Sequence, residues 1–132
     1  MDQLATEYAP RLRSGTAQEQ QQAMQAIADF TAEYLAPHPQ QVGELYSFAD
    51  RQAGPGFTET MRYEHATFAS DIRYFRTLAD APQPDVELFR SRLRSYIACM
   101  QSHLEREDMT IAAQVVEHEM DRRGRTSTTA ER

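Results

Sequence analysis

Apolar residues recur at helical spacing along most of the chain. Between Thr58 and Asp80, and again between Asp85 and about Arg122, they follow one another at steps of four and three residues, which is the rhythm of a heptad seam. The seam residues are Met61, His65, Phe68, Ile72, Phe75 and Ala79 in the first stretch, and Phe89, Leu93, Tyr96, Met100, His103, Glu107 and Ile111 in the second. Only a short Pro-rich turn separates the stretches, so the pattern predicts two long helices that pack antiparallel.

The first half of the chain carries a weaker helical pattern. Residues 3–13 have apolar positions at helical spacing but include a proline, so they predict only a short helix. Thr16 and Glu19 form a capping box that opens a second helix, and this helix stops or kinks at residues 37–39, which read Pro-His-Pro. A further helical turn or two precedes the Ala-Gly-Pro-Gly break at residues 53–56. We therefore expect an all-α fold with a short first helix and a kinked or broken second helix.

Composition and charge limit the class of protein. A chain of 132 residues with 40% hydrophobic and 26% charged residues is typical of one globular domain, which we place at residues 1–122 with a flexible tail at 123–132. The net charge is −6 and the arginines are spread along the chain, so we expect no nucleic-acid partner. The chain has neither a long apolar stretch nor a basic segment followed by an apolar one, so we expect no membrane span and a cytoplasmic location.

Three polar residues occupy seam positions that should face the interior of the bundle. His65 lies between Met61 and Phe68, and His103 and Glu107 lie one turn apart on the next helix. A buried carboxylate is costly unless it is paired or binds a metal. A His and a Glu at this spacing can bind the same ion, and a second His from a facing helix can complete three ligands. The alternative is a structural His–Glu network in which an arginine satisfies Glu107.

The sequence around these residues resembles a known family. Tyr63-Glu64-His65, followed by Ser102-His103-Leu104-Glu105-Arg106-Glu107-Asp108, is similar to the second half of a hemerythrin-like HHE cation-binding domain, where the two elements are written EH and HxxxE. The resemblance covers residues 58 to about 120. It implies an up-down four-helix bundle that holds a non-heme di-iron centre, with one His and one HxxxE pair from each half of the bundle.

The first half of the chain departs from the family pattern. Tyr8 stands where the first His is expected, and Pro37 and Gln41 stand where the second His and its Glu are expected. The candidate metal ligands are His65, His103, Glu107 and His38, with Tyr8 and Glu44 as further candidates. This set predicts a mononuclear or degenerate di-iron site, and zinc or manganese are alternatives to iron.

Two functions follow from these observations. An iron site with open positions would bind or sense dioxygen, nitric oxide or peroxide. A bundle that has lost its metal would instead serve as a protein interaction module through its Gln-rich and acidic surfaces. The short first helix also predicts a homodimer, because it leaves one side of the bundle for a second copy to cover. The chain has no Ser-His-Asp order, Gly-rich phosphate loop or CxxC motif, and we leave open whether it is an enzyme.

Three other features are assigned to structure rather than to chemistry. His118, between Glu117 and Glu119, indicates a solvated helix end. Cys99, next to the seam residue Met100, indicates a small core residue. Tyrosines and phenylalanines, Tyr46 among them, are assigned to packing in the core.

Overall fold

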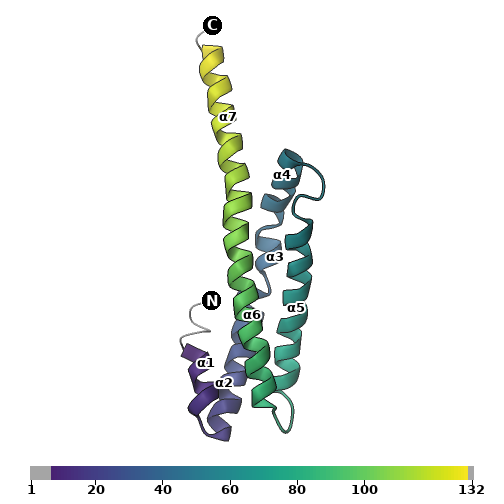
Figure 1. Ribbon diagram of the computed structural model, residues 1–132, viewed down its shortest axis with the longest axis vertical. Helices are drawn as coiled ribbons and strands as arrows, with labels where there is room; N and C mark the ends of the chain where they lie inside the picture. Colours follow the sequence, from purple (N-terminus) through teal and green to yellow (C-terminus); the bar gives the residue numbers. More distant parts are fainter. Residues whose placement is uncertain (1–6, 131–132) are drawn as a thin grey trace.

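The computed structural model describes residues 7–130, with side chains as far as Gly124, and these residues form helices joined by short turns (Figure 1). The elements are α1 (Ala9–Ser14), α2 (Ala17–Phe30), η2 (Thr31–Leu35), α3 (His38–Gln41), α4 (Gly43–Ala53), α5 (Glu59–Ala79), α6 (Val86–Glu107), η3 (Asp108–Ala112) and α7 (Ala113–Ala130), where η denotes a π-helical segment. No β-strand occurs in this part of the chain, which confirms the all-α prediction.

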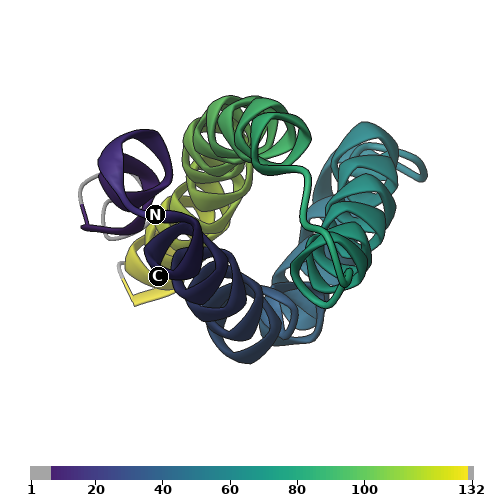
Figure 2. The same ribbon diagram turned by 90° about the horizontal axis from the view of Figure 1, so that it is seen from below.

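The elements group into four columns that run up and down (Figures 1 and 2). The first column is α1, and the second consists of α2, η2, α3 and α4. The third is α5, and the fourth is the long rod formed by α6, η3 and α7. The predicted up-down four-helix bundle, with a short first helix and an interrupted second helix, is confirmed. Every described helix is too short or too polar to reach across a bilayer.

Local sequence signals account for the main helix boundaries. The Thr16 hydroxyl oxygen accepts a hydrogen bond from the Glu19 backbone N–H at 3.2 Å, as expected for an N-cap. Asp85 caps α6 in the same way, through the Leu88 backbone N–H at 3.0 Å. The turn between α4 and α5 uses Gly54 and Gly56, whose φ angles of 117° and 85° are strained for any other residue. These boundaries fix where the inward-facing positions of α5 and α6 begin.

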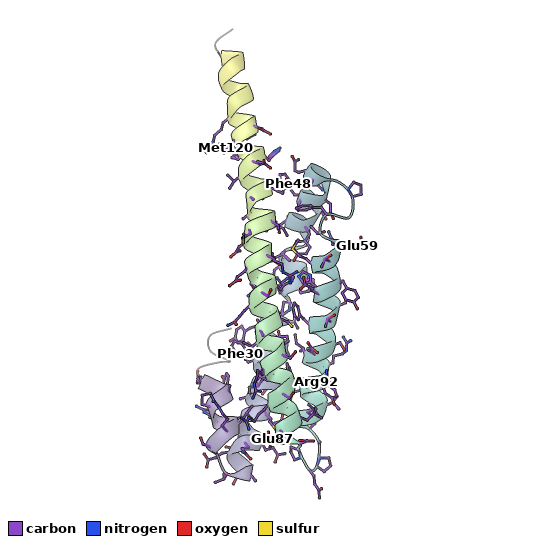
Figure 3. All side chains as sticks on the ribbon, viewed as in Figure 1. Phe30, Phe48, Glu59, Glu87, Arg92 and Met120 are labelled. Atoms are coloured by element: carbon purple, nitrogen blue, oxygen red, sulfur yellow. The ribbon has the colours of Figure 1, made fainter. Side chains whose placement is uncertain are left out.

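The core has two parts with polar residues between them. The larger part lies toward the α1 end and includes Phe75 and Phe89, which are fully buried. Burial of each such side chain stabilises the fold by roughly 1.5–3 kcal/mol. The smaller part consists of Tyr46, Ala49, Met61 and Ile111. Side chains fill the space between the columns along the bundle (Figure 3). The buried histidines of α5 and α6 lie in sequence between the residues of the two parts, which places a polar layer inside the bundle.

Some boundaries and environments differ from the sequence-based expectations. We expected the last helix to end near Arg122. The fourth column instead stays helical through Gly124 and ends at Ala130. Residues 1–6 and 131–132, which belong to the expected first helix and tail, lie outside the described residues, and the division into a domain and a tail stays a prediction.

The assignment of Cys99 to the core is wrong, since its side chain is exposed. Cys99 lies one residue before Met100, and one helical step turns it about 100° away from the seam.

His118 also differs from its expected environment. Its ring packs edge-on against Phe48 of α4, with ring centroids 5.0 Å apart and an interplanar angle of 83°. His118 is partly buried, and it belongs to the contact between α4 and α7 rather than to a helix end surrounded by water.

Candidate metal centre

Four side chains with metal-binding atoms meet in the middle of the bundle. They come from three columns: His38 lies on α3, His65 on α5, and His103 and Glu107 on α6. One ligand atom from each lies within 4.8 Å of all the others. His65 is 8% exposed and His103 is fully buried, while His38 and Glu107 are partly buried. The structure therefore brings together all four residues that the sequence nominated as its main candidates.

The four ligand atoms converge around one carboxylate oxygen. Glu107 Oε2 lies 3.0 Å from Nε2 of His38, 3.0 Å from Nε2 of His103 and 3.8 Å from Nε2 of His65. The Nε2 atoms of His65 and His103 are themselves 3.0 Å apart. Three imidazole nitrogens and one carboxylate oxygen form a donor set that suits Fe(II), Zn(II) or Mn(II).

The backbone explains how His38 enters the cluster although the expected ligand positions beside it do not. Pro37 and Pro39 interrupt the second column, so the short helix α3 has its own orientation between η2 and α4. Pro37 has no ligand atom, and Gln41 is exposed. The family pattern expects metal ligands at these two positions. In this chain the residue that reaches Glu107 is His38, which directly follows Pro37.

The two further candidates lie elsewhere. Tyr8 packs against Phe30 at the α1 end, with ring centroids 6.1 Å apart, beside the larger part of the core. Glu44 is exposed on α4 and lines a surface groove. Neither belongs to the cluster in this structure, because the first column reaches only the lower part of the bundle (Figure 1) and Glu44 lines the groove between α4 and α7.

Tyr46 is the residue of the site that sequence reasoning missed. Its hydroxyl donates a hydrogen bond to Glu107 Oε2 at 2.5 Å, and the same oxygen lies 3.0 Å from His65 Nε2 and 3.4 Å from His103 Nε2. Its ring stacks on His65, with centroids 5.0 Å apart and planes 19° from parallel. No spacing rule could have found it, since the helix is interrupted between His38 and Tyr46.

Burial and hydrogen bonding set the charges of the cluster. Burial, together with the neighbouring His103 and His38, lowers the pKa of His65 to about 4. Burial opposes ionisation of Glu107, but hydrogen bonds from Tyr46 and His38 outweigh it and hold the pKa of Glu107 below its usual value. Burial and the hydrogen bond to Glu107 raise the pKa of the Tyr46 hydroxyl. His65 is thus neutral and Glu107 ionised at neutral pH, which are the forms that bind a metal ion.

A second layer of polar groups supports His103. Its Nδ1 atom lies 3.4 Å from Glu64 Oε1, and the Arg106 guanidinium donates a hydrogen bond to the other oxygen of Glu64. A carboxylate behind a ligating imidazole fixes its tautomer and ring orientation. Glu64 is the acidic residue of the EH pair noted in the sequence, and the geometry gives it this supporting position.

A narrow cleft leads from the surface to the cluster. It has a volume of about 20 Å³ and reaches His38 and His65. The other lining residues are Leu35, Ala36, Pro39, Phe68, Ala69, Ile72 and Met100. The volume suits one molecule about the size of water, and the walls are apolar.

Comparison with known proteins agrees with this geometry. The family model described as the Hemerythrin HHE cation binding domain matches residues 2–115. Searches of the curated proteins and of the solved structures found no match to the chain. The family match includes the first half, which the resemblance in the sequence covered poorly. The chain belongs to the hemerythrin family of HHE cation-binding domains.

Proposed function

We propose that this protein holds non-heme iron at His38, His65, His103 and Glu107 and binds or senses a small ligand there, namely dioxygen, nitric oxide or peroxide. The observation that carries the proposal is the convergence of three imidazole nitrogens and one carboxylate oxygen within 4.8 Å inside the bundle. Membership of a cation-binding family supports it. The same donor set would also accept zinc or manganese.

The donor set favours one metal ion over two. Among the described residues, these four side chains form the one group of three or more His, Cys, Asp or Glu ligands that lie close enough to share an ion. A second ion would need the ligands that Pro37 and Gln41 replace. Four protein ligands leave positions open on an ion that prefers five or six, and a small exogenous ligand would fill them.

The residues around the cluster control what reaches it. Bound iron would supply the open coordination positions and the change of oxidation state. Phe68, Ile72 and Met100 keep the interior apolar and limit the entry of water. Glu64 holds His103 in orientation. The size of the cleft suits diatomic ligands and peroxide better than larger substrates.

Nitric oxide binding tests the proposal. The full chain would be reconstituted anaerobically with Fe(II) and titrated with nitric oxide, and binding would be followed by electron paramagnetic resonance. Ala69 lines the cleft, so Ala69→Met should slow nitric oxide binding without changing the iron content. Ala66→Met is the matched control, since Ala66 is exposed on the same helix and does not line the cleft. Iron-loaded protein that shows no response to nitric oxide would contradict the proposal.

A second candidate is a metal-free bundle that acts as a protein interaction module. Hydrogen bonds alone can satisfy the carboxylate, because Tyr46, His38 and His103 all lie within hydrogen-bond distance of Glu107. A bound metal stabilises the folded state by linkage, so a chelator should lower the thermal midpoint of a true metal protein. An unchanged midpoint would favour the interaction module.

A further inference from the structure

The hydroxyl oxygen of Tyr46 lies among the candidate metal ligands. It is 2.5 Å from Glu107 Oε2, 3.0 Å from His65 Nε2 and 3.4 Å from His103 Nε2. These distances place it against three of the four ligand atoms. An atom this close to three ligands is also within reach of an ion that they share.

The position of that oxygen is fixed by packing. Tyr46 is 1% exposed, and its ring stacks on His65. The guanidinium of Arg62, which lies on α5, is 5.4 Å from the centroid of the Tyr46 ring. The side chain therefore cannot swing away from the cluster without disturbing the smaller part of the core, where it packs with Ala49, Met61 and Ile111.

We propose that Tyr46 is a further metal ligand, which binds ferric iron through its phenolate oxygen. The proposal rests on the proposed function, because it needs iron at the same site. On binding, the O–H bond of Tyr46 breaks and an oxygen–iron bond forms. One proton leaves for the solvent, and no electron moves in this step. An anionic oxygen ligand stabilises ferric iron more than ferrous iron, as the tyrosine ligand of some haem proteins does.

The ligand changes what the centre is suited to do. Reversible dioxygen carriage begins from ferrous iron, and a phenolate disfavours that state. A ferric centre is suited to peroxide instead. A phenolate ligand would therefore favour peroxide over dioxygen at this centre.

Tyr96 provides a matched control. It is also buried and lies on α6, but its ring packs against Phe68 and Phe75 in the larger part of the core. Its hydroxyl has no hydrogen-bond partner among the described residues. Removing this hydroxyl should leave the metal centre unchanged.

The test uses the full chain loaded anaerobically with Fe(II) and then oxidised with hexacyanoferrate(III), which is reduced to hexacyanoferrate(II). Iron content and the visible spectrum are measured on the same sample. We expect a visible charge-transfer band, and we expect resonance Raman excitation in that band to enhance tyrosine ring vibrations. Tyr46→Phe should lose both signals, and Tyr96→Phe should keep both.

The outcomes separate the two proposals. Wild-type protein that contains ferric iron but shows no tyrosine-enhanced band overturns the assignment of Tyr46 and leaves the iron site standing. A band that survives in Tyr46→Phe also overturns it. Protein without iron overturns both proposals. If Tyr46→Phe fails to fold, as judged by circular dichroism, the resonance Raman spectrum of the wild-type protein decides alone.

Discussion

The carboxylate of Glu107 organises the centre at the scale of single residues. Its Oε2 atom has three hydrogen-bonding neighbours: the Tyr46 hydroxyl at 2.5 Å and the Nε2 atoms of His38 and His103 at 3.0 Å. These groups come from α3, α4 and α6, so one side chain ties together two columns of the bundle. A carboxylate that is buried in this way needs such partners or a metal ion to offset its desolvation.

The carboxylate behind His103 gives a first prediction. Glu64→Gln keeps the size of the side chain but removes the charge that orients His103, so we expect iron affinity to fall roughly 10–100-fold while the stoichiometry at saturating iron is unchanged. Competition with a chromogenic chelator would measure the affinity. Glu59→Gln, an exposed change at the start of the same helix, should bind iron as the wild type does. Equal affinities in the two variants would argue against a supporting role for Glu64.

His65 makes the stability of the metal-free protein depend on pH. Burial, with the nearby His103 and His38, lowers its pKa to about 4 from the ordinary 6.5 of the unfolded chain. Between these values the unfolded chain binds more protons than the folded chain, so the free energy of unfolding rises with pH. The stabilisation is complete above about pH 6.5 and is lost as the pH falls toward 4, by roughly 2 kcal/mol at pH 4.5.

Urea denaturation of chelator-treated protein at pH 7 and pH 4.5 would measure this loss. His65→Phe lacks the titrating group, so its acid loss should be smaller than that of the wild type by about the same amount. An identical acid loss in the two proteins would show that His65 does not contribute.

The sequence predicted part of this site, and the rest depended on geometry. His65, His103 and Glu107 were recognisable because polar residues at heptad positions on long regular helices must face inward. Tyr46 was not recognisable, since a tyrosine in a core is ordinary and the helix before it is interrupted. His38 was nominated from the family pattern, but only the fold showed that it, rather than its neighbours, approaches Glu107.

At the scale of elements, breaks in the regular helices lie directly beside the candidate metal ligands. The second column is interrupted at Pro37 and Pro39, and the fourth column becomes π-helical directly after Glu107. A π-helical turn shifts the helical register and is common beside functional sites. The steps of four and three predicted the two long helices, whereas no sequence rule applied here predicted the π-helical turns. Regular periodicity is readable from sequence, and its local breaks are set by tertiary packing.

The turn between α4 and α5 gives a prediction at this scale. Asp50 accepts hydrogen bonds from the backbone N–H of Thr58 at 2.9 Å and from the hydroxyl of Thr58, and it pairs with Arg62 at 3.3 Å. Asp50 thereby caps the start of α5, which carries His65. Asp50→Ala should lower the free energy of unfolding by about 1–3 kcal/mol, because it leaves buried donors of Thr58 without an acceptor.

Urea denaturation would measure the change. Asp121→Ala, a loss of one exposed carboxylate on α7, is the matched control and should change the stability by less than about 0.5 kcal/mol. If Asp50→Ala were as mild as the control, the network would not stabilise the turn.

At the scale of the whole molecule, the bundle is unevenly covered. The first column lies at one end only, and the upper part of α7 rises beyond α4, where Met120 stands exposed (Figures 1 and 3). A groove of about 530 Å³ lies between α4 and α7, and Leu45, Phe48 and Val115 are among its lining residues. Leu45 is 46% exposed, so this apolar surface is open within the described part of the chain.

We expect a second copy of the chain to cover this surface. The exposed Val116 and Met120 lie one turn apart on α7, and Val116 directly follows Val115, which lines the groove, so they add apolar surface beside it. A twofold axis would let the same patch serve both copies. Sedimentation should therefore show a dimer at micromolar concentration.

Two substitutions sharpen this prediction. Leu45→Glu places a charge in the groove and should shift the protein toward monomer. Tyr63→Ser removes a side chain that is 74% exposed on α5, away from the groove, and should leave the dimer intact. Wild-type protein that sediments as a monomer would contradict the prediction.

The iron content of the purified full chain tests the central claim most directly. After anaerobic reconstitution with Fe(II) and removal of loosely bound metal, elemental analysis should find about one iron per chain, as one set of four ligands implies. His103→Ala should lose this iron, and His118→Ala, which changes a histidine outside the cluster, should keep it. Iron near zero in the wild type, or equal iron in wild type and His103→Ala, would contradict the account.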